Sequence, residues 1–166
     1  MSLRPPPHGA KTVVANLQDT YAPNSVCFGC GPKNELGLRL KSVPTDGRVV
    51  ADWTPGKEHV AFEGFGSGGI ISVLMDCHGN WAAAYALMKA KGLSSPPGTV
   101  TAEYTVKFLK PSPIGKPWHL AARATKVEGD RAYVSGDLRI DGVLTATMNG
   151  LFVAVREGHP AFGRWR

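Results

Sequence analysis

The feature that most constrains the fold is a long apolar segment that begins at Gly68 and continues to about Lys91. Its large apolar side chains recur at steps of three or four residues, which is the period of one helix face, and no proline interrupts it. Further apolar residues widen this face, so we expect a helix that is buried on most sides. Gly92 and the Pro-Pro-Gly sequence at residues 96–98 end it.

Alternating polar and apolar residues follow the helix in four segments, which predict β-strands. Links of two residues join the last three of them, as in β-hairpins, so these strands are antiparallel neighbours. Residues 37–53 predict two more strands around a turn at residues 45–47. We therefore expect an α+β fold in which one curved antiparallel sheet wraps around one long central helix. The four segments are Thr99–Leu109, Trp118–Glu128, Arg131–Ile140 and Val143–Val155.

The length of 166 residues fits one domain. With 43% hydrophobic and 19% charged residues, the chain can bury a core and lacks the composition of a disordered protein. We divide it into an N-terminal arm at residues 1–25, a domain at residues 26–156 and a C-terminal tail at residues 157–166. The arm has an irregular apolar pattern, from which we expect a short helix and little contribution to the core.

The chain carries 19 Lys and Arg against 13 Asp and Glu, a net charge of +6, which favours anionic ligands. The basic residues form no run, so we expect a phosphate-bearing small molecule and not a nucleic acid as the partner. No signal sequence or membrane-spanning segment is evident, and three cysteines do not make a secreted disulfide framework. We expect a cytoplasmic protein with no membrane partner.

A glycine-rich segment, residues 64–69, leads into the helix. It contains a Gly-x-Gly-x-x-Gly pattern but lacks the βαβ context and the later acidic residue that dinucleotide binding needs. The backbone amides at a helix start stabilise negative charge, and glycine lets a ligand approach them. The segment therefore indicates a binding site for a developing oxyanion, and a turn that only connects two elements is the alternative.

Asp76 lies inside the apolar helix, where a carboxylate has low helix propensity and a high desolvation cost if it is buried. It follows Gly69 by two turns, about 10 Å along the axis, and shares its face with Asn80. A carbonyl polarised at Gly69 and an oxygen supplied at Asp76 would make an acyl-transfer site. Thr101 is a candidate to orient a water there. An exposed or purely structural Asp76 is the alternative.

Cys27 and Cys30 form a single Cys-x-x-Cys motif. A structural zinc site needs four ligands, and Cys77 and His78 join only if the fold happens to bring them close. A redox dithiol usually opens a helix, whereas the Gly-Pro sequence after Cys30 indicates a turn. We expect the cysteines to be packing residues and no metal to be bound, with zinc and redox roles as the alternatives.

Several motifs occur in a recognisable order: CFGCGPKNELGL at residues 27–38, EH at 58–59, GGI at 68–70, LMD at 74–76 and FLKP at 108–111. Together they resemble the PaaI-like group of hotdog-fold acyl-CoA thioesterases, over roughly residues 25–155. The resemblance implies hydrolysis of an acyl-CoA thioester, with coenzyme A as part of the substrate and no other cofactor. It also implies a homodimer or homotetramer with active sites at the protomer interface.

The resemblance also assigns roles to residues. By position, Asp76 matches the family's catalytic carboxylate, Gly69 the residue whose amide polarises the thioester carbonyl, and Thr101 a residue that helps to place the water. Ser67 stands where the family usually has His, and Ala61 where some members have an active-site Asn. Ser67 can donate one hydrogen bond but cannot supply imidazole chemistry.

We expect the substrate to contact residues around this site and its phosphates to contact basic side chains. The absence of the family's His and Asn side chains leaves a hotdog protein that binds acyl-CoA without turnover as the alternative. A hydratase, the third hypothesis, requires an acid-base pair with Asp76, for which His59 is the only candidate. The expected substrate-binding residues are Gly68, His59, Asn80, Lys107, Lys110 and Arg123.

Overall fold

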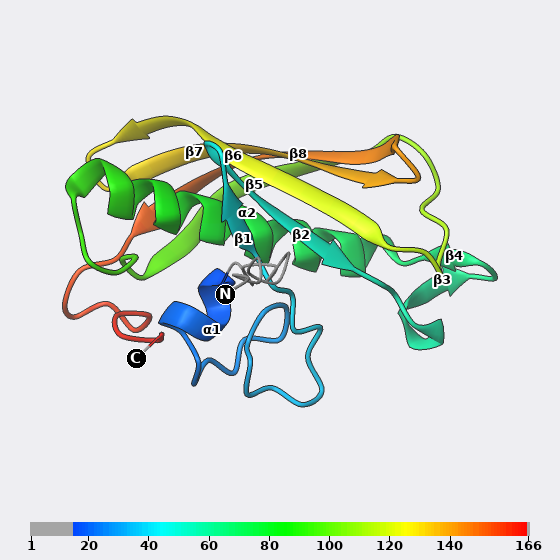
Figure 1. The fold of residues 1–166 in the computed structure, drawn as a ribbon, viewed down its shortest axis with the longest axis horizontal. Helices are drawn as coiled ribbons and strands as arrows, with labels where there is room; N and C mark the ends of the chain where they lie inside the picture. Colours follow the sequence, from blue (N-terminus) through cyan, green and yellow to red (C-terminus); the bar gives the residue numbers. More distant parts are fainter. Residues whose placement is uncertain (1–14, 166) are drawn as a thin grey trace, which may run out of the picture.

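The computed structural model describes residues 15–165. Figure 1 shows helix α2 (Gly68–Lys91) lying along one face of an antiparallel sheet, with the N-terminal segment on the other side of the helix. The six strands of the sheet have the order β1-β2-β6-β7-β8-β5. The expected fold class, a sheet wrapped around one central helix, is confirmed. The strands are β1 (Val43–Thr45), β2 (Arg48–Trp53), β5 (Thr99–Phe108), β6 (Trp118–Glu128), β7 (Arg131–Ile140) and β8 (Val143–Ala154).

Helix α2 has the predicted bounds and is buried along most of its length. Ser67 is its N-cap, and Gly92 ends it in the left-handed conformation, with a φ of 62°, which glycine adopts without a steric cost. Leu74 and Leu87 are fully buried, and Trp81 is 1% exposed. The sheet covers one side of the helix, and residues 17–40 contribute core side chains on another. This covering on two sides suits a helix that has no broad polar face.

The four strands after the helix are confirmed almost to the residue, and the two strands predicted before it are shorter than expected. Strand β1 begins only at Val43, because the backbone before it pairs with a different partner. The N–H groups of Leu38 and Leu40 donate to the carbonyls of Phe28 and Gly29, at 2.8 and 3.0 Å. Leu38 and Leu40 are therefore buried in a loop and not in a sheet strand, and Leu36 is exposed.

A small hairpin of β3 (Val60–Phe62) and β4 (Phe65–Gly66), which the sequence analysis did not predict, positions the start of α2. The N–H of Gly66 donates to the carbonyl of Ser112 at 2.8 Å. The N–H of Ser67 donates to the carbonyl of His59, also at 2.8 Å. The glycine-rich segment is thus half hairpin and half helix start.

The N-terminal arm contains the expected short helix, α1 (Leu17–Tyr21), but the expectation that the arm adds little to the core is wrong. Leu17 is 2% exposed and Ala22 is 1% exposed, and both belong to the same core cluster as α2. The C-terminal tail also folds back, since the rings of Trp165 and Trp81 stack at 4.3 Å. The face of α2 that the sheet leaves uncovered needs these segments to exclude water from it.

A buried polar network connects the arm, the sheet and α2 through His78. Its Nε2–H donates to the carbonyl of Val49 at 3.1 Å, and its Nδ1 accepts from the Ser42 hydroxyl at 2.8 Å. Ser42 is held in turn by Gln18, whose Nε2 donates to the Ser42 hydroxyl oxygen at 3.0 Å. A neutral ring suits both partners of His78, and burial lowers its pKa to about 4.

We predict that acid weakens the fold through His78. Between its ordinary pKa of 6.5 and about 4, the unfolded chain binds a proton that the folded chain does not. The free energy of unfolding therefore falls as the pH is lowered through this window, by at most about 1.4 kcal/mol per pH unit. Denaturant unfolding at pH 7, 6 and 5 measures the slope in the parent and in His78→Gln.

The His78→Gln variant should be less stable at pH 7 and should show a smaller slope between pH 7 and 5. His159→Gln is the matched control, because His159 lies exposed in the C-terminal tail, and it should keep the parent's slope. A His78→Gln variant with the parent's full slope would show that the proton binds elsewhere.

Candidate active site

The start of α2 presents the backbone amide of Gly69 at the protein surface. Gly69 is exposed, and it has no side chain to prevent a ligand from approaching its N–H. In this structure the N–H donates to the hydroxyl oxygen of Ser67, the helix cap, at 3.2 Å. The predicted oxyanion donor is therefore accessible but already has an acceptor, which a substrate oxygen has to replace or share. Ser67 acts here as an acceptor and not as the donor that the sequence suggested.

Two side-chain pairs join α2 to β5. Thr101 Oγ1 donates to Asp76 Oδ1 at 2.6 Å, and Thr99 Oγ1 donates to Asn80 Oδ1 one helical turn further on. Four residues of helix rise about 6 Å, and two residues of strand span about 6.6 Å, so the two pairs are in register. The structure thus brings Asp76, Thr101 and Asn80 to one place. Asn80 is buried, and its side-chain amide donates to the backbone carbonyl of Thr99 at 3.5 Å.

Asp76 is only partly buried, and its surroundings adjust its basicity. Burial raises the pKa of its carboxyl group above the ordinary value, and the hydrogen bond from Thr101 partly opposes this. The positive charge of Arg164 opposes it as well. A carboxylate with a raised pKa accepts a proton from water more readily than an ordinary one.

A β-bulge at Ala102 decides which residues of β5 face the helix. Thr101 pairs with Phe152 and Glu103 with Leu151, so Ala102 has no partner of its own on β8. Before the bulge, odd-numbered residues such as Thr101 face α2. After the bulge the even-numbered residues face α2 instead: Val106 packs against the core, and the Phe108 ring lies over Gly68.

The reversal adds Tyr104 to the site and turns Lys107 away from it. Burial and the charge of Asp76 raise the pKa of the Tyr104 phenol, and the side chain of Ser72 contacts it. Tyr104 was not predicted as a site residue, because strict alternation along the strand places it on the face opposite Thr101. A bulge between two residues of a strand leaves no clear signal in a single sequence.

A cavity of about 340 Å³ lies beside Asp76. The loop at residues 25–30, helix α2, strand β5 and the C-terminal tail all contribute to its wall. Arg164 and Trp165 come from the tail, and their place here was not predicted, since nothing in a short tail indicates where it folds back. The cavity is lined by Ser25, Val26, Cys27, Cys30, Asp76, Cys77, Asn80, Trp81, Val100, Thr101, Arg164 and Trp165.

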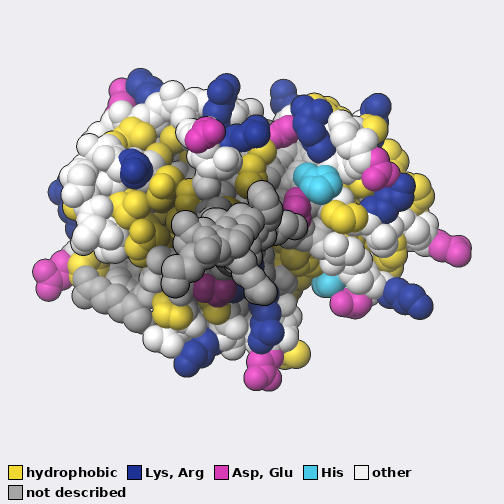
Figure 2. Space-filling model, viewed as in Figure 1, with side chains coloured by type: hydrophobic (Ala, Val, Ile, Leu, Met, Phe, Trp, Pro, Cys, Tyr) yellow, Lys and Arg dark blue, Asp and Glu magenta, His cyan; other side chains and the backbone are white. Residues whose placement is uncertain are grey.

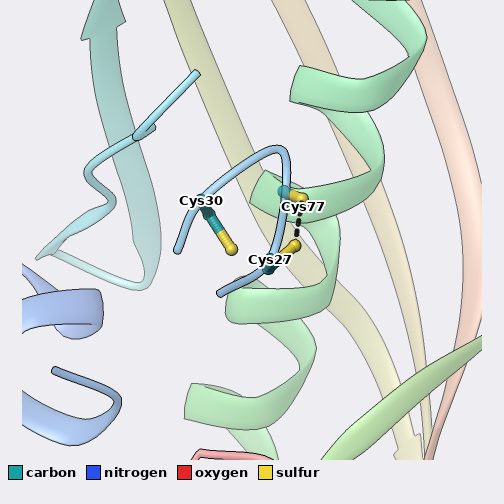
Figure 3. Close-up of side chains that lie close together, drawn as sticks. All are labelled: Cys27, Cys30 and Cys77. Atoms are coloured by element: carbon teal, nitrogen blue, oxygen red, sulfur yellow. Dashed lines mark hydrogen bonds between the residues drawn. The ribbon is translucent and has the colours of Figure 1, made fainter. Parts of the chain in front are cut away.

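The three cysteines lie close together (Figure 3), and all three line this cavity. Their sulfur atoms all lie within 4.8 Å of one another, and those of Cys27 and Cys77 are 3.7 Å apart. The fold therefore brings Cys77 close to the Cys-x-x-Cys pair, which the sequence alone could not predict. The neighbouring thiols of Cys30 and Cys77 lower the pKa of Cys27, whereas the pKa values of Cys30 and Cys77 are raised.

His59 lies apart from Asp76. Its Nδ1 accepts from the N–H of Gly56 at 2.8 Å, and its ring packs edge-on against Trp53 at 4.9 Å. Its side chain is not part of the wall of the 340 Å³ cavity. The acid-base pair with Asp76 that a hydratase requires is not formed within the chain.

The basic residues expected to bind phosphates are also not gathered at Asp76. Arg123 lines a separate cavity of about 720 Å³ between the β1–β2 hairpin, α2 and β6, together with Lys89. Lys107 and Lys110 are exposed on β5 and just beyond it. On the face drawn in Figure 2, Lys and Arg side chains are scattered and form no single patch. No helix in the described part of the chain is long and apolar enough to cross a membrane.

Solved structures of thioesterase-superfamily proteins are similar to this fold. A thioesterase superfamily protein from Shewanella loihica is 29% identical, with a TM-score of 0.61 over 70% of this chain and 91% of its own. The PaaI protein of E. coli is 16% identical, with a TM-score of 0.61 over 72% and 81% of the two chains. A Streptococcus mutans protein solved with acetyl-CoA is also 16% identical, with a TM-score of 0.59 over 70% and 88%.

No protein-family model matches the sequence, and no curated protein matches it significantly. The structural matches confirm the hotdog fold and, with it, the resemblance that the motifs indicated. They do not test the roles of individual residues, so the assignments at Asp76, Gly69, Thr101 and Ser67 stay predictions.

We predict that Ser67 stabilises the start of α2. Ser67→Ala removes the only side-chain cap that the structure gives this helix start, and it should lower the free energy of unfolding by about 1 kcal/mol. Ser67→Asp should restore most of the loss, because a carboxylate both caps the helix and suits its dipole. Chemical denaturation measures both variants, and equal stability of Ser67→Ala and the parent would contradict the capping role.

Proposed function

We propose that this chain, a hotdog-fold protein of the thioesterase superfamily, hydrolyses the thioester bond of an acyl-CoA to a free acid and coenzyme A. The observation that carries the proposal is the partly buried Asp76 carboxylate, which Thr101 holds at the wall of a cavity. The three described cysteines are free thiols, which suits the cytoplasmic location that we also propose.

Asp76 acts in one of two ways, as a general base or as a nucleophile. As a general base its carboxylate takes a proton from water, the water oxygen bonds to the thioester carbon, and the carbon–sulfur bond breaks with the proton returned to the leaving sulfur. As a nucleophile the carboxylate itself bonds to that carbon, and the carbon–sulfur bond breaks to release the coenzyme A thiolate, which takes a proton from the solvent. Water then hydrolyses the resulting anhydride to the free acid and the restored carboxylate. In both routes Thr101 fixes the carboxylate. The Gly69 N–H stabilises the negative charge that develops on the carbonyl oxygen.

The distance between these two groups argues for a site made by two protomers. Gly69 and Asp76 are seven residues apart on one helix, which corresponds to about 10 Å along its axis. A single thioester cannot contact both, because the reacting atoms must approach to about 3 Å. A second copy of the chain, paired around a two-fold axis, can bring its Asp76 to this Gly69.

Strand β5 provides the edge for such pairing. It is ten residues long and lies at one end of the sheet, whereas β1, at the other end, has only three residues. A long free edge exposes unpaired backbone groups that a second copy can bind. The exposed apolar side chains of Tyr104, Phe108 and Leu109 lie on or beside this strand. We therefore propose a homodimer, alone or within a tetramer, that pairs along β5.

Acyl-CoA is the proposed substrate because a fold neighbour binds acetyl-CoA and because the chain is basic. The net charge of +6 favours a ligand with a pyrophosphate and a further phosphate. Lys110 lies just beyond β5, so a dimer that pairs along this edge brings the Lys110 side chains of both copies to the interface, whereas Lys107 on β5 faces away from Asp76. Arg123 lies in its own cavity and is the weakest of the three assignments.

Binding without turnover is the second candidate, and one contact favours it. The Gly69 N–H is engaged by Ser67, and neither Ser67 nor Ala61 supplies the side chain that the resemblance implies at its position. Release of free thiol from acetyl-, long-chain and aromatic acyl-CoA decides between the two functions. Calorimetric binding without hydrolysis over hours would replace the proposed reaction with a binding function.

We predict that Asp76→Asn lowers kcat by at least about 100-fold, the scale expected for the loss of a catalytic base or nucleophile. The amide keeps the shape of the side chain and can still accept from Thr101, so the protein should remain folded. Free-thiol release measures the rate, and circular dichroism with thermal melting controls for folding.

Thr101→Val is the matched comparison, because it keeps the carboxylate and removes only the hydroxyl that holds it. It should lower kcat less than Asp76→Asn does, and Thr101→Ser should restore most of the loss. A folded Asp76→Asn variant with the parent's kcat would remove Asp76 from the mechanism.

We also predict that two inactive variants complement each other. Gly69→Pro removes the N–H in the first helical turn, where proline is tolerated, and Asp76→Asn removes the base. In a random mixture of dimers, half are heterodimers and each has one intact site of two, so about a quarter of the parent activity should return. Co-expression with two affinity tags isolates the mixed dimers, and folded mixed dimers without activity would contradict a shared site.

A further inference from the structure

Three cysteine thiols from two distant parts of the chain converge beside the candidate active site. Cys27 and Cys30 lie in the irregular loop before β1, and Cys77 lies in the middle of α2 (Figure 3). Their sulfur atoms all lie within 4.8 Å of one another. We propose that the three thiolates bind one soft divalent cation of the zinc type, whose fourth coordination position opens into the cavity that Asp76 also lines.

The spacing of the sulfur atoms suits such a cation. Zinc binds thiolates at about 2.3 Å in tetrahedral geometry, which places neighbouring sulfurs about 3.8 Å apart. The sulfurs of Cys27 and Cys77 are already 3.7 Å apart. Since no pair exceeds 4.8 Å, closing the triangle around the ion needs side-chain shifts of only about 1 Å.

The loop is shaped so that its two cysteines reach the third. A Cβ on Gly29, inside the Cys-x-x-Cys turn, would lie 2.4 Å from the sulfur of Cys77, so only glycine allows the turn to rest on the helix there. A Cβ on Gly31 would lie 2.4 Å from the backbone nitrogen of Cys27, and the Gly31 N–H instead donates to the Cys27 carbonyl at 2.8 Å. Gly29 thus lets the loop lie against the Cys77 side chain of α2, and Gly31 lets the turn that holds Cys27 and Cys30 close on itself.

One of the three sulfurs accepts a hydrogen bond from a neighbouring side chain, as metal-bound ligands commonly do. The indole Nε1–H of Trp81 donates to the sulfur of Cys30 at 3.4 Å. Donors of this kind stabilise negatively charged sulfur and orient it, which is the role of outer partners at metal sites.

The fourth position of the cation faces the cavity. All three cysteines line the 340 Å³ cavity, which has room for a water or another small ligand atom. Among the described residues no carboxylate or imidazole has a ligand atom within 4.8 Å of all three sulfurs, so Asp76 is not part of the cluster. Three thiolates and a divalent cation leave one negative charge, and Arg164 lines the same cavity with a positive one.

A bound cation would fix the loop to the helix one residue away from Asp76. Cys27 and Cys30 would be fastened to Cys77, so the wall of the cavity opposite β5 would hold its shape. Because the folded chain gathers the three ligands and the unfolded chain does not, metal binding should also stabilise the fold.

The test uses the full chain, purified with a phosphine reductant and stripped with a chelator. A thiol assay on the denatured protein should count three free thiols, and elemental analysis before stripping should find about one zinc per chain. Titration of the stripped protein with Co²⁺ should give thiolate-to-cobalt charge-transfer absorption that saturates at one equivalent. Zn²⁺ should displace the Co²⁺ and raise the melting temperature of the parent.

Cys27→Ser and Cys77→Ser should each weaken Zn²⁺ binding at least about tenfold and remove most of the charge-transfer absorption. Thr101→Val is the matched control, because it alters the same cavity without removing a sulfur, and it should keep the parent's affinity. A stripped, fully reduced parent that shows no charge-transfer absorption with Co²⁺ would overturn the proposal, whatever the variants do. A Cys27–Cys77 disulfide that persists with the reductant would overturn it as well, and binding unchanged in both cysteine variants would do the same.

Discussion

Burial of one helix on most of its sides is the constraint on which the rest of the structure depends. Helix α2 has no broad polar face, so the sheet alone cannot keep it from water. The remaining cover comes from the N-terminal arm, the loop before β1 and the C-terminal tail, which contribute Leu17, Leu40 and Trp165 to the same core cluster. Burying apolar area stabilises by roughly 25 cal/mol per Å², so these flanking segments belong to the folding unit.

This constraint explains how much of the fold the sequence could predict. The period of the apolar residues at 68–91 and the links at 129–130 and 141–142 are local signals, and the elements they predict are present. Local signals do not predict the burial of the arm and the tail, because this burial depends on a helix surface that is distant in sequence. The bulge at Ala102 is not predicted for a different reason: one extra residue in a strand changes which face its neighbours lie on without any change in composition.

The candidate site divides in the same way. Asp76 stands out in the sequence because a carboxylate in an apolar helix needs a partner, and Thr101 is that partner. Tyr104 and Arg164 lie beyond such reasoning, because one depends on the bulge and the other on the return of the tail. The meeting of Cys77 with Cys27 and Cys30 depends on how the loop crosses the helix, which no spacing along the chain encodes.

Asp76 and Cys77 show how one turn of helix can serve two purposes. Adjacent residues point about 100° apart around the axis, so Asp76 faces β5 while Cys77 faces the loop before β1. The carboxylate is thereby held from the strand side and the thiols meet on the loop side, and both reach the same cavity. The loop at residues 25–30 forms part of the cavity wall, whereas the Asp76–Thr101 hydrogen bond joins only α2 and β5. Contacts at the cysteines therefore shape the cavity wall beside Asp76, and the charge of Cys27 also acts on the carboxyl group, because it helps to raise the pKa of Asp76.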